Sequence, residues 1–178
     1  IQPQLNLKAP LASPALTGTP TAPTAAAGTN TTQLATTAFV QDSFSFKGFS
    51  ARISSSVAMT GSDNKTVNTT NFPSLSENWD TDAWFNPATG RFQPDEAGVF
   101  LVSIHVSALG LTTGASLYFF KNGVIDRYKQ TSGTTNVNDE FSFEYSLNGS
   151  TDYIEFKIDP GSDTAWTVSD LTVQGSRQ

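Results

Sequence analysis

The chain has 178 residues, a formal net charge of −6 at pH 7 and no cysteine. This acidic balance disfavours binding to nucleic-acid phosphates or anionic membranes, and the missing cysteine excludes disulfides, thiolate metal sites and catalytic thiols. We therefore expect no nucleic-acid partner. No apolar run approaches the roughly 20 residues that cross a bilayer as a helix, so we also expect no membrane insertion.

Residues 1–46 differ in composition from the rest of the chain. They carry two charged side chains, Lys8 and Asp42, and five of the nine prolines. Proline favours extended backbone, and alanine and threonine bury little area, so one chain could not pack this region into a core. We expect an extended stem that neighbouring chains order, or alternatively a flexible linker. Because the sequence begins with Ile1 rather than Met, we also expect more chain upstream.

One short helix is predicted in this region, near residues 31–44. Asn30 stands three residues before Gln33, a spacing typical of a capping box. A helix of roughly 12 to 15 residues is marginal in isolation, so it would need partners around a common axis. The helix would present one stripe to that axis, formed by the trimerisation residues Leu34, Ala38 and Gln41.

From Lys47 onward, apolar residues recur at every second position, which is the spacing of a strand with one buried face. The longest run alternates polar residues with Phe100, Val102, Ile104, Val106 and Ala108. The same alternation occurs in Phe49, Ala51, Ile53, Val57 and Met59, and in Phe141, Phe143, Tyr145 and Leu147.

Turn signals separate the later strands. Asn122-Gly123 lies between the apolar runs 117–120 and 124–125, which predicts a two-residue β-hairpin, and Asn148-Gly149 predicts a second tight turn. In the last strand the apolar positions change parity near Ser169, which indicates a β-bulge. Many short strands without crossover helices indicate an all-β, antiparallel sandwich over residues 47–178.

Four motifs carry a family resemblance across this region. They are FSA at 49–51, FNPATGRFQPDEAGVF at 85–100, LYFFKNG at 117–123 and YIEF at 153–156. Together they resemble the jelly-roll heads of tumour necrosis factor and the complement globular domains. The C-terminal strand departs from that family's ending. The resemblance implies a homotrimer that associates through exposed aromatic sheet edges.

A second resemblance lies in the N-terminal region. The strings LASPALTGTPTAP at 11–23 and GTNTTQLATTAFV at 28–40 resemble a segment of bacteriophage and prophage tail fibres. This resemblance implies a trimeric fibre on the virion surface, made in the bacterial host cytoplasm and joined to other virion proteins through its N-terminal side. Its distal head would bind a host cell-surface glycan or protein.

The sequence offers little for catalysis. His105 is the only histidine and falls on the polar face of a predicted strand, and no Gly-x-Ser-x-Gly motif occurs. The acidic pairs fit solvated loops better than glycoside hydrolysis; they are Asp80 with Asp82, Asp95 with Glu96, and Asp139 with Glu140. We therefore expect no enzyme activity, no cofactor, no metal site and no catalytic residues.

Strand counting predicts where a receptor would bind. Loops alternate between the two ends of an antiparallel sandwich, so the loops of residues 60–83, 110–115, 130–136 and 159–165 should share the end opposite the stem. Trp79 is the first candidate, although it could instead be a core or interface residue. The receptor-binding candidates are Asn64, Trp79, Asp80, Asp82, Thr112, Asn136 and Asp163. The alternatives are a structural virion decoration without a ligand and a non-viral trimeric surface protein.

Overall fold

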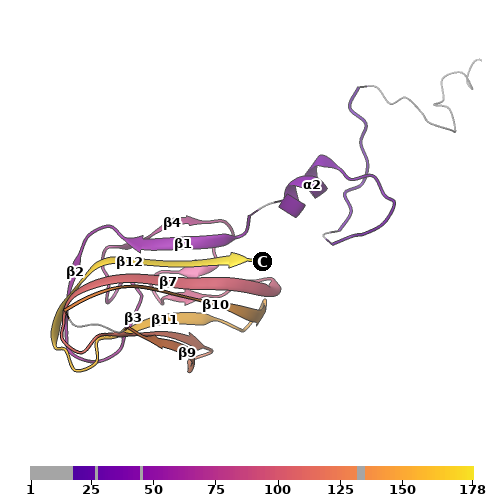
Figure 1. Cartoon of the computed structure of the whole chain (residues 1–178). Coiled ribbons are helices and arrows are strands. Elements are labelled where there is room, and N and C mark those ends of the chain that lie inside the picture. The colour runs from indigo at the N-terminus through magenta and orange to yellow at the C-terminus, as the bar shows by residue number, and fades with distance from the viewer. Residues whose placement is uncertain (1–17, 27, 45, 132–134) are drawn as a thin grey trace, which may run out of the picture. The chain divides into compact units, whose positions relative to one another are not determined.

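A computed structural model describes residues 18–26, 28–44, 46–131 and 135–178. The chain divides into two compact units, Ile1–Ser45 and Phe46–Gln178. The second unit is a two-sheet β-sandwich, which confirms the predicted all-β antiparallel fold (Figure 1). We call it the β-sandwich.

The helix of the first unit, α2, spans Thr37–Phe44 and is shorter than predicted. Its cap is Thr36, whose hydroxyl accepts a hydrogen bond from the Phe39 amide at 3.2 Å and whose carbonyl accepts one from Val40. Asn30 and Gln33 form no capping box. Threonine has low helix propensity and bonds readily to nearby backbone, so the threonine-rich stretch before residue 37 stays non-helical. Leu34 therefore precedes the helix.

Sheet A holds six strands of the described residues, in the order β10-β7-β12-β1-β4, with β2 paired to β12. Every pairing in it is antiparallel. The strands are β1 (Gly48–Ile53), β2 (Val57–Thr60), β4 (Leu75–Asp80), β7 (Ala97–Leu111), β10 (Thr135–Asn148) and β12 (Ala165–Arg177).

Sheet B, also with six strands in the described part of the chain, has the order β5-β6-β11-β8-β9, with β3 paired to β11. Its pairings are antiparallel as well. The strands are β3 (Lys65–Thr66), β5 (Phe85–Asn86), β6 (Arg91–Phe92), β8 (Ser116–Lys121), β9 (Val124–Gln130) and β11 (Ile154–Asp159).

The core lies between the sheets and is rich in phenylalanine. The alternation predicted for β7 is confirmed, because all five of its predicted apolar residues are fully buried. In β10, an edge strand, Phe143 is 37% exposed while Tyr145 and Leu147 are buried. The fully buried phenylalanines are Phe49, Phe72, Phe92, Phe100, Phe119 and Phe156.

The predicted irregularities have mixed outcomes. Asn122 and Gly123 have φ values of 54° and 80°, as a primed two-residue hairpin turn requires, so this hairpin is confirmed. The bulge in β12 is confirmed between Val168 and Asp170. The turn after Asn148 is different in kind, because β10 and β11 belong to different sheets and residues 149–153 cross between them.

The β-sandwich has two ends. At the entry end, β1 begins beside the end of β12, with Gly48 opposite Ser176, and β7 begins opposite Asn148 (Figure 1). At the far end, β2 finishes opposite the start of β12, and Leu111 of β7 lies opposite the start of β10. These registers fix the end to which each loop belongs.

Candidate functional site

The structure brings four of the seven candidate residues to the far end. Three of them are on adjoining loops: the Gly61 amide donates to the Thr164 carbonyl at 2.9 Å, and Asp163 accepts hydrogen bonds from residues 112 and 113. The fourth, Asn136, lies at the start of β10, opposite Leu109. Asn64 and Asn136 have exposed side chains. The four are Asn64, Thr112, Asn136 and Asp163.

Asp163 ties two of the far-end loops together. Its carboxylate is buried and accepts from the Thr112 amide at 2.7 Å, the Thr113 amide at 3.2 Å and both threonine hydroxyls. These hydrogen bonds, the Thr112 hydroxyl foremost, lower the pKa of Asp163 below its usual value. Asp163 therefore shapes the far end, and its oxygens are largely occupied.

We expect the Thr112 and Thr113 amide chemical shifts to titrate together with a midpoint below about pH 3.9, the usual aspartate value. A lowered folded pKa means that the stabilisation is complete above the unfolded pKa and is lost as pH falls through the folded pKa. Asp163→Asn should abolish this titration, measured by NMR. Asp63→Asn, which alters an exposed ion pair with Lys65 near the same end, should leave it intact. A midpoint at or above pH 3.9 would contradict this assignment.

Trp79, Asp80 and Asp82 lie at the entry end, so their predicted place at the far end is wrong. Residues 75–80 form strand β4, which runs back along β1 and ends with Asp80 opposite Phe49. The Trp79 ring is 40% exposed and packs edge-on against Phe46, with 5.3 Å between ring centroids. The candidate set is thus divided between the two ends.

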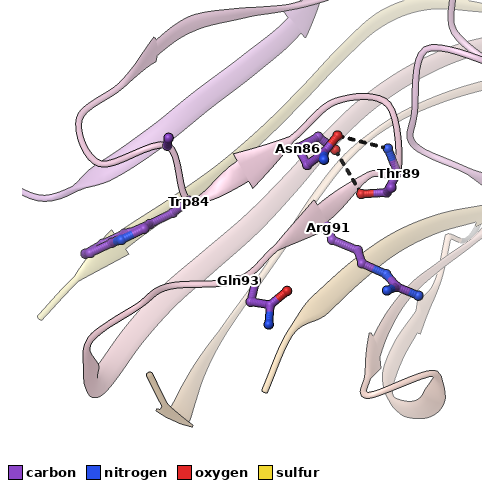
Figure 2. A pocket seen from close by; sticks show the side chains of 6 residues that line it. Trp84, Asn86, Thr89, Arg91 and Gln93 are labelled. Atoms are coloured by element: carbon purple, nitrogen blue, oxygen red, sulfur yellow. Dashed lines mark hydrogen bonds between the residues drawn. The ribbon is translucent and has the colours of Figure 1, made fainter. Parts of the chain in front are cut away.

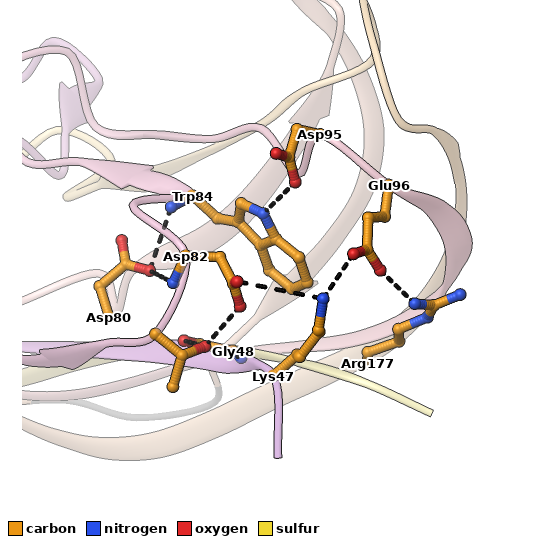
Figure 3. A network of polar contacts seen from close by, with 9 residues as sticks. Lys47, Gly48, Asp80, Asp82, Trp84, Asp95, Glu96 and Arg177 are labelled. Atoms are coloured by element: carbon orange, nitrogen blue, oxygen red, sulfur yellow. Dashed lines mark hydrogen bonds and ion pairs between the residues drawn. The ribbon is translucent and has the colours of Figure 1, made fainter. Parts of the chain in front are cut away.

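Asp80 organises the turn after β4. Its Oδ1 accepts from the Trp84 amide at 3.0 Å, and its Oδ2 accepts from the Phe85 amide at 2.8 Å. Asp82 accepts from the Thr81 hydroxyl at 2.8 Å and lies 4.0 Å from Lys47 Nζ (Figure 3). Both carboxylates hold the loop in place, which is a structural role.

A charged network that sequence reasoning missed closes the entry end. Glu96 pairs with both Lys47, at the start of the β-sandwich, and Arg177, at its end (Figure 3). The hydrogen bond to Glu96 is the main cause that raises the pKa of Lys47. Beside it, Trp84 Nε1 donates to Asp95 at 2.7 Å. The network joins the two termini of the β-sandwich to the turn before β7.

The remaining chemistry-bearing residues are dispersed. His105 Nε2 lies 3.7 Å from Asp170 on the outward face of sheet A. Asp139 pairs with Lys129. Within the described ranges, no three His, Cys, Asp or Glu side chains gather closely enough to hold a metal ion. The same ranges contain no helix long and apolar enough to span a membrane.

Comparison with known sequences finds a short, strong similarity. Over 35 residues, which are 20% of this chain, the sequence is 77% identical to the probable tail fiber protein of Escherichia phage P2. The matched stretch is 5% of that protein, so the chain spans only a small part of its relative's length. The predicted resemblance to phage tail fibres is confirmed. No family model matches the chain.

Solved structures share the fold with very low sequence identity. Murine APRIL superimposes with a TM-score of 0.53 at 10% identity, covering 75% of this chain and all of the APRIL chain. The PRD1 vertex protein P5 gives a TM-score of 0.51 at 7% identity, covering 73% of this chain and 95% of that one. The jelly-roll resemblance predicted from the sequence motifs is thereby confirmed as a fold.

Proposed function

We propose that the chain is a subunit of a homotrimeric virion fibre. Residues 1–46 form the stem, which joins other virion proteins on its N-terminal side, and residues 47–178 form a head that binds a host cell-surface glycan or protein. The observation that carries this proposal is the 77% identity to the probable tail fiber protein over 35 residues. The jelly-roll fold agrees with it but fixes no function by itself.

Trimer formation by the β-sandwich is supported by apolar side chains on the outward face of β7. Val99, Leu101 and Leu109 are 44%, 37% and 45% exposed, whereas Phe100, Val102 and Ala108 on the other face of the strand are fully buried. Val99 and Leu101 adjoin on this face, and Leu109 lies farther along it. Exposed apolar residues that adjoin on one strand face are typical of an interaction surface. We place the contact between β-sandwich subunits on this face of sheet A.

Trimer formation by the stem is supported by the exposed side chains of its predicted trimerisation residues. Leu34 is 72% exposed, and Ala38 and Gln41 are exposed as well. Helix α2 has eight residues, too few for stability in isolation. Packing of Leu34, Ala38 and Gln41 against the same segment of neighbouring chains would bury the leucine and stabilise the helix.

The far end is the surface we assign to the receptor. Loops on a rigid sandwich are where binding residues usually lie. Asn64 and Asn136 present exposed amides there, which can both donate and accept hydrogen bonds, as sugar hydroxyls require. Thr112 and Asp163 hold the surrounding loops in shape. The entry-end candidates are outside this surface.

Adsorption of purified protein to host bacteria tests the assignment. The double variant Asn64→Ala/Asn136→Ala should reduce cell binding at least about tenfold, since losing a hydrogen bond to each amide costs roughly 1 kcal/mol apiece. The control is Trp79→Ala/Asp82→Ala at the entry end, which should bind like the wild type. Loss of adsorption in the control, with the far-end variant unaffected, would overturn the assignment.

A further inference from the structure

A pocket of about 300 Å³ lies on the β5–β6 hairpin of sheet B, outside the far-end surface. This volume is at the lower end of those that hold small ligands. Figure 2 shows Arg91 on β6 and Gln93 just after it, with Asn86 and Thr89 at the turn of the hairpin. The lining residues are Ala83, Trp84, Asn86, Thr89, Arg91 and Gln93.

The turn of the hairpin orients Asn86. Its side-chain oxygen accepts from the backbone amides of Ala88 at 3.0 Å and Thr89 at 3.3 Å. The oxygen is therefore committed to the turn, and the amide nitrogen is left as a donor. In the described part of the chain, no protein group accepts a hydrogen bond from that nitrogen.

Residues 150–155 hold the side chains of Arg91 and Gln93 in place. Arg91 Nε donates to Glu155 at 3.0 Å, and its guanidinium lies 4.1 Å from the centre of the Tyr153 ring. Gln93 Nε2 donates to the Ser150 carbonyl at 2.9 Å, which leaves Oε1 as an acceptor. Among the described residues, the terminal nitrogens of Arg91 and Oε1 of Gln93 have no hydrogen-bond partner.

The remaining wall is rigid. Trp84 is buried, its indole is bonded to Asp95, and its carbonyl accepts from the Gln93 amide at 2.7 Å. Ala83 has a φ of 57°, a left-handed conformation that non-glycine residues rarely adopt and that surrounding contacts must maintain. A pre-organised wall loses little conformational freedom when a ligand binds.

The arrangement favours a neutral, hydroxyl-rich ligand. Asn86 lies opposite Arg91 in the β5–β6 pair, so both side chains are on one face of sheet B, and both line the same pocket as Gln93. Two donor groups and one acceptor in one pocket suit hydroxyl groups, because each hydroxyl both donates and accepts. Glu155 offsets the charge of Arg91, so the pocket lacks the net positive charge that an acidic sugar would need. We propose that this pocket binds one neutral hexose unit of a surface glycan. The proposal rests on the proposed receptor-binding function and adds a second contact to it.

Titration of the ¹⁵N-labelled chain with methyl glucoside, methyl galactoside and N-acetylglucosamine tests the pocket. At least one should shift the Trp84 indole N–H signal while the Trp79 and Trp166 signals stay in place. Arg91→Ala should weaken that binding at least about tenfold. The matched control is Arg127→Ala, because Arg127 also pairs with a carboxylate, Asp126, and lies over an aromatic ring, but outside the pocket.

The titration can contradict the pocket proposal without contradicting the fibre proposal. If none of the three sugars shifts the Trp84 signal, or if only an acidic sugar such as N-acetylneuraminic acid does, the pocket proposal is wrong. Equal weakening by Arg91→Ala and Arg127→Ala would also overturn it. In each of these cases, continued binding of the wild type to host cells would leave the fibre proposal standing.

Discussion

Phe49→Ala is expected to lower the free energy of unfolding of the β-sandwich by about 3–5 kcal/mol. Phe49 is fully buried and stacks on Phe85 and Phe92, with ring centroids 4.5 and 5.0 Å away. Gly175 makes room for the ring, since a Cβ there would lie 2.6 Å from Phe49 Cε1. Truncation would leave a cavity that the flanking strands cannot close. The resulting loss of unfolding free energy is a large part of the total stability of a typical domain.

Urea unfolding at fixed protein concentration, followed by tryptophan fluorescence, measures this loss. Phe46→Ala is the matched control, because Phe46 is 60% exposed and its ring packs edge-on against Trp79 at the surface. We expect it to cost less than about 1 kcal/mol. Equal costs for the two substitutions would show that the aromatic cluster around Phe49 does not stabilise the core as described.

Leu101→Lys is expected to convert the proposed trimer of about 57 kDa, three copies of the 19.0 kDa chain, into monomers. Leu101 lies on the outward face of β7, opposite Glu144 of β10. A lysine there can pair with Glu144 in the single chain, so the fold should persist. Burying its charge between subunits would cost several kcal/mol and break the contact.

Light scattering after size exclusion measures the molar mass. Tyr128→Lys is the control, because Tyr128 is 62% exposed on sheet B, outside the proposed contact, and should leave the trimer intact. Leu34→Asp should weaken the trimer less, because the β-sandwich contact remains. A Leu101→Lys protein that stays trimeric would remove the outward face of sheet A from the interface.

Those parts of the fold that depend on local pattern could be predicted from the sequence. The alternation from Phe100 to Ala108 needs only one strand with one buried face. The Asn122-Gly123 hairpin needs only two residues that tolerate positive φ. The parity change near Ser169 is itself the trace of a bulge. In each case a few neighbouring residues determine the structure.

Features that depend on distant partners could not be predicted. β4 has a single buried apolar residue, Leu75, followed by largely exposed side chains, so its sequence resembles a loop and pairing with β1 makes it a strand. For this reason strand counting from the sequence places Trp79 at the wrong end. Glu96 contacts Lys47 across 49 residues and Arg177 across 81, and no spacing in the sequence indicates either pair. The start of α2 was missed because Asn30 and Thr36 are both acceptable caps.

The role proposed for this chain is that of a fibre subunit whose β-sandwich binds a bacterial surface. Binding of the fluorescently labelled protein to susceptible bacteria and to resistant mutants that lack the receptor tests this role. We predict saturable binding to the susceptible cells, at least about tenfold above that to the resistant cells. Equal binding to both, or binding to neither, would contradict receptor recognition and indicate a structural decoration of the virion.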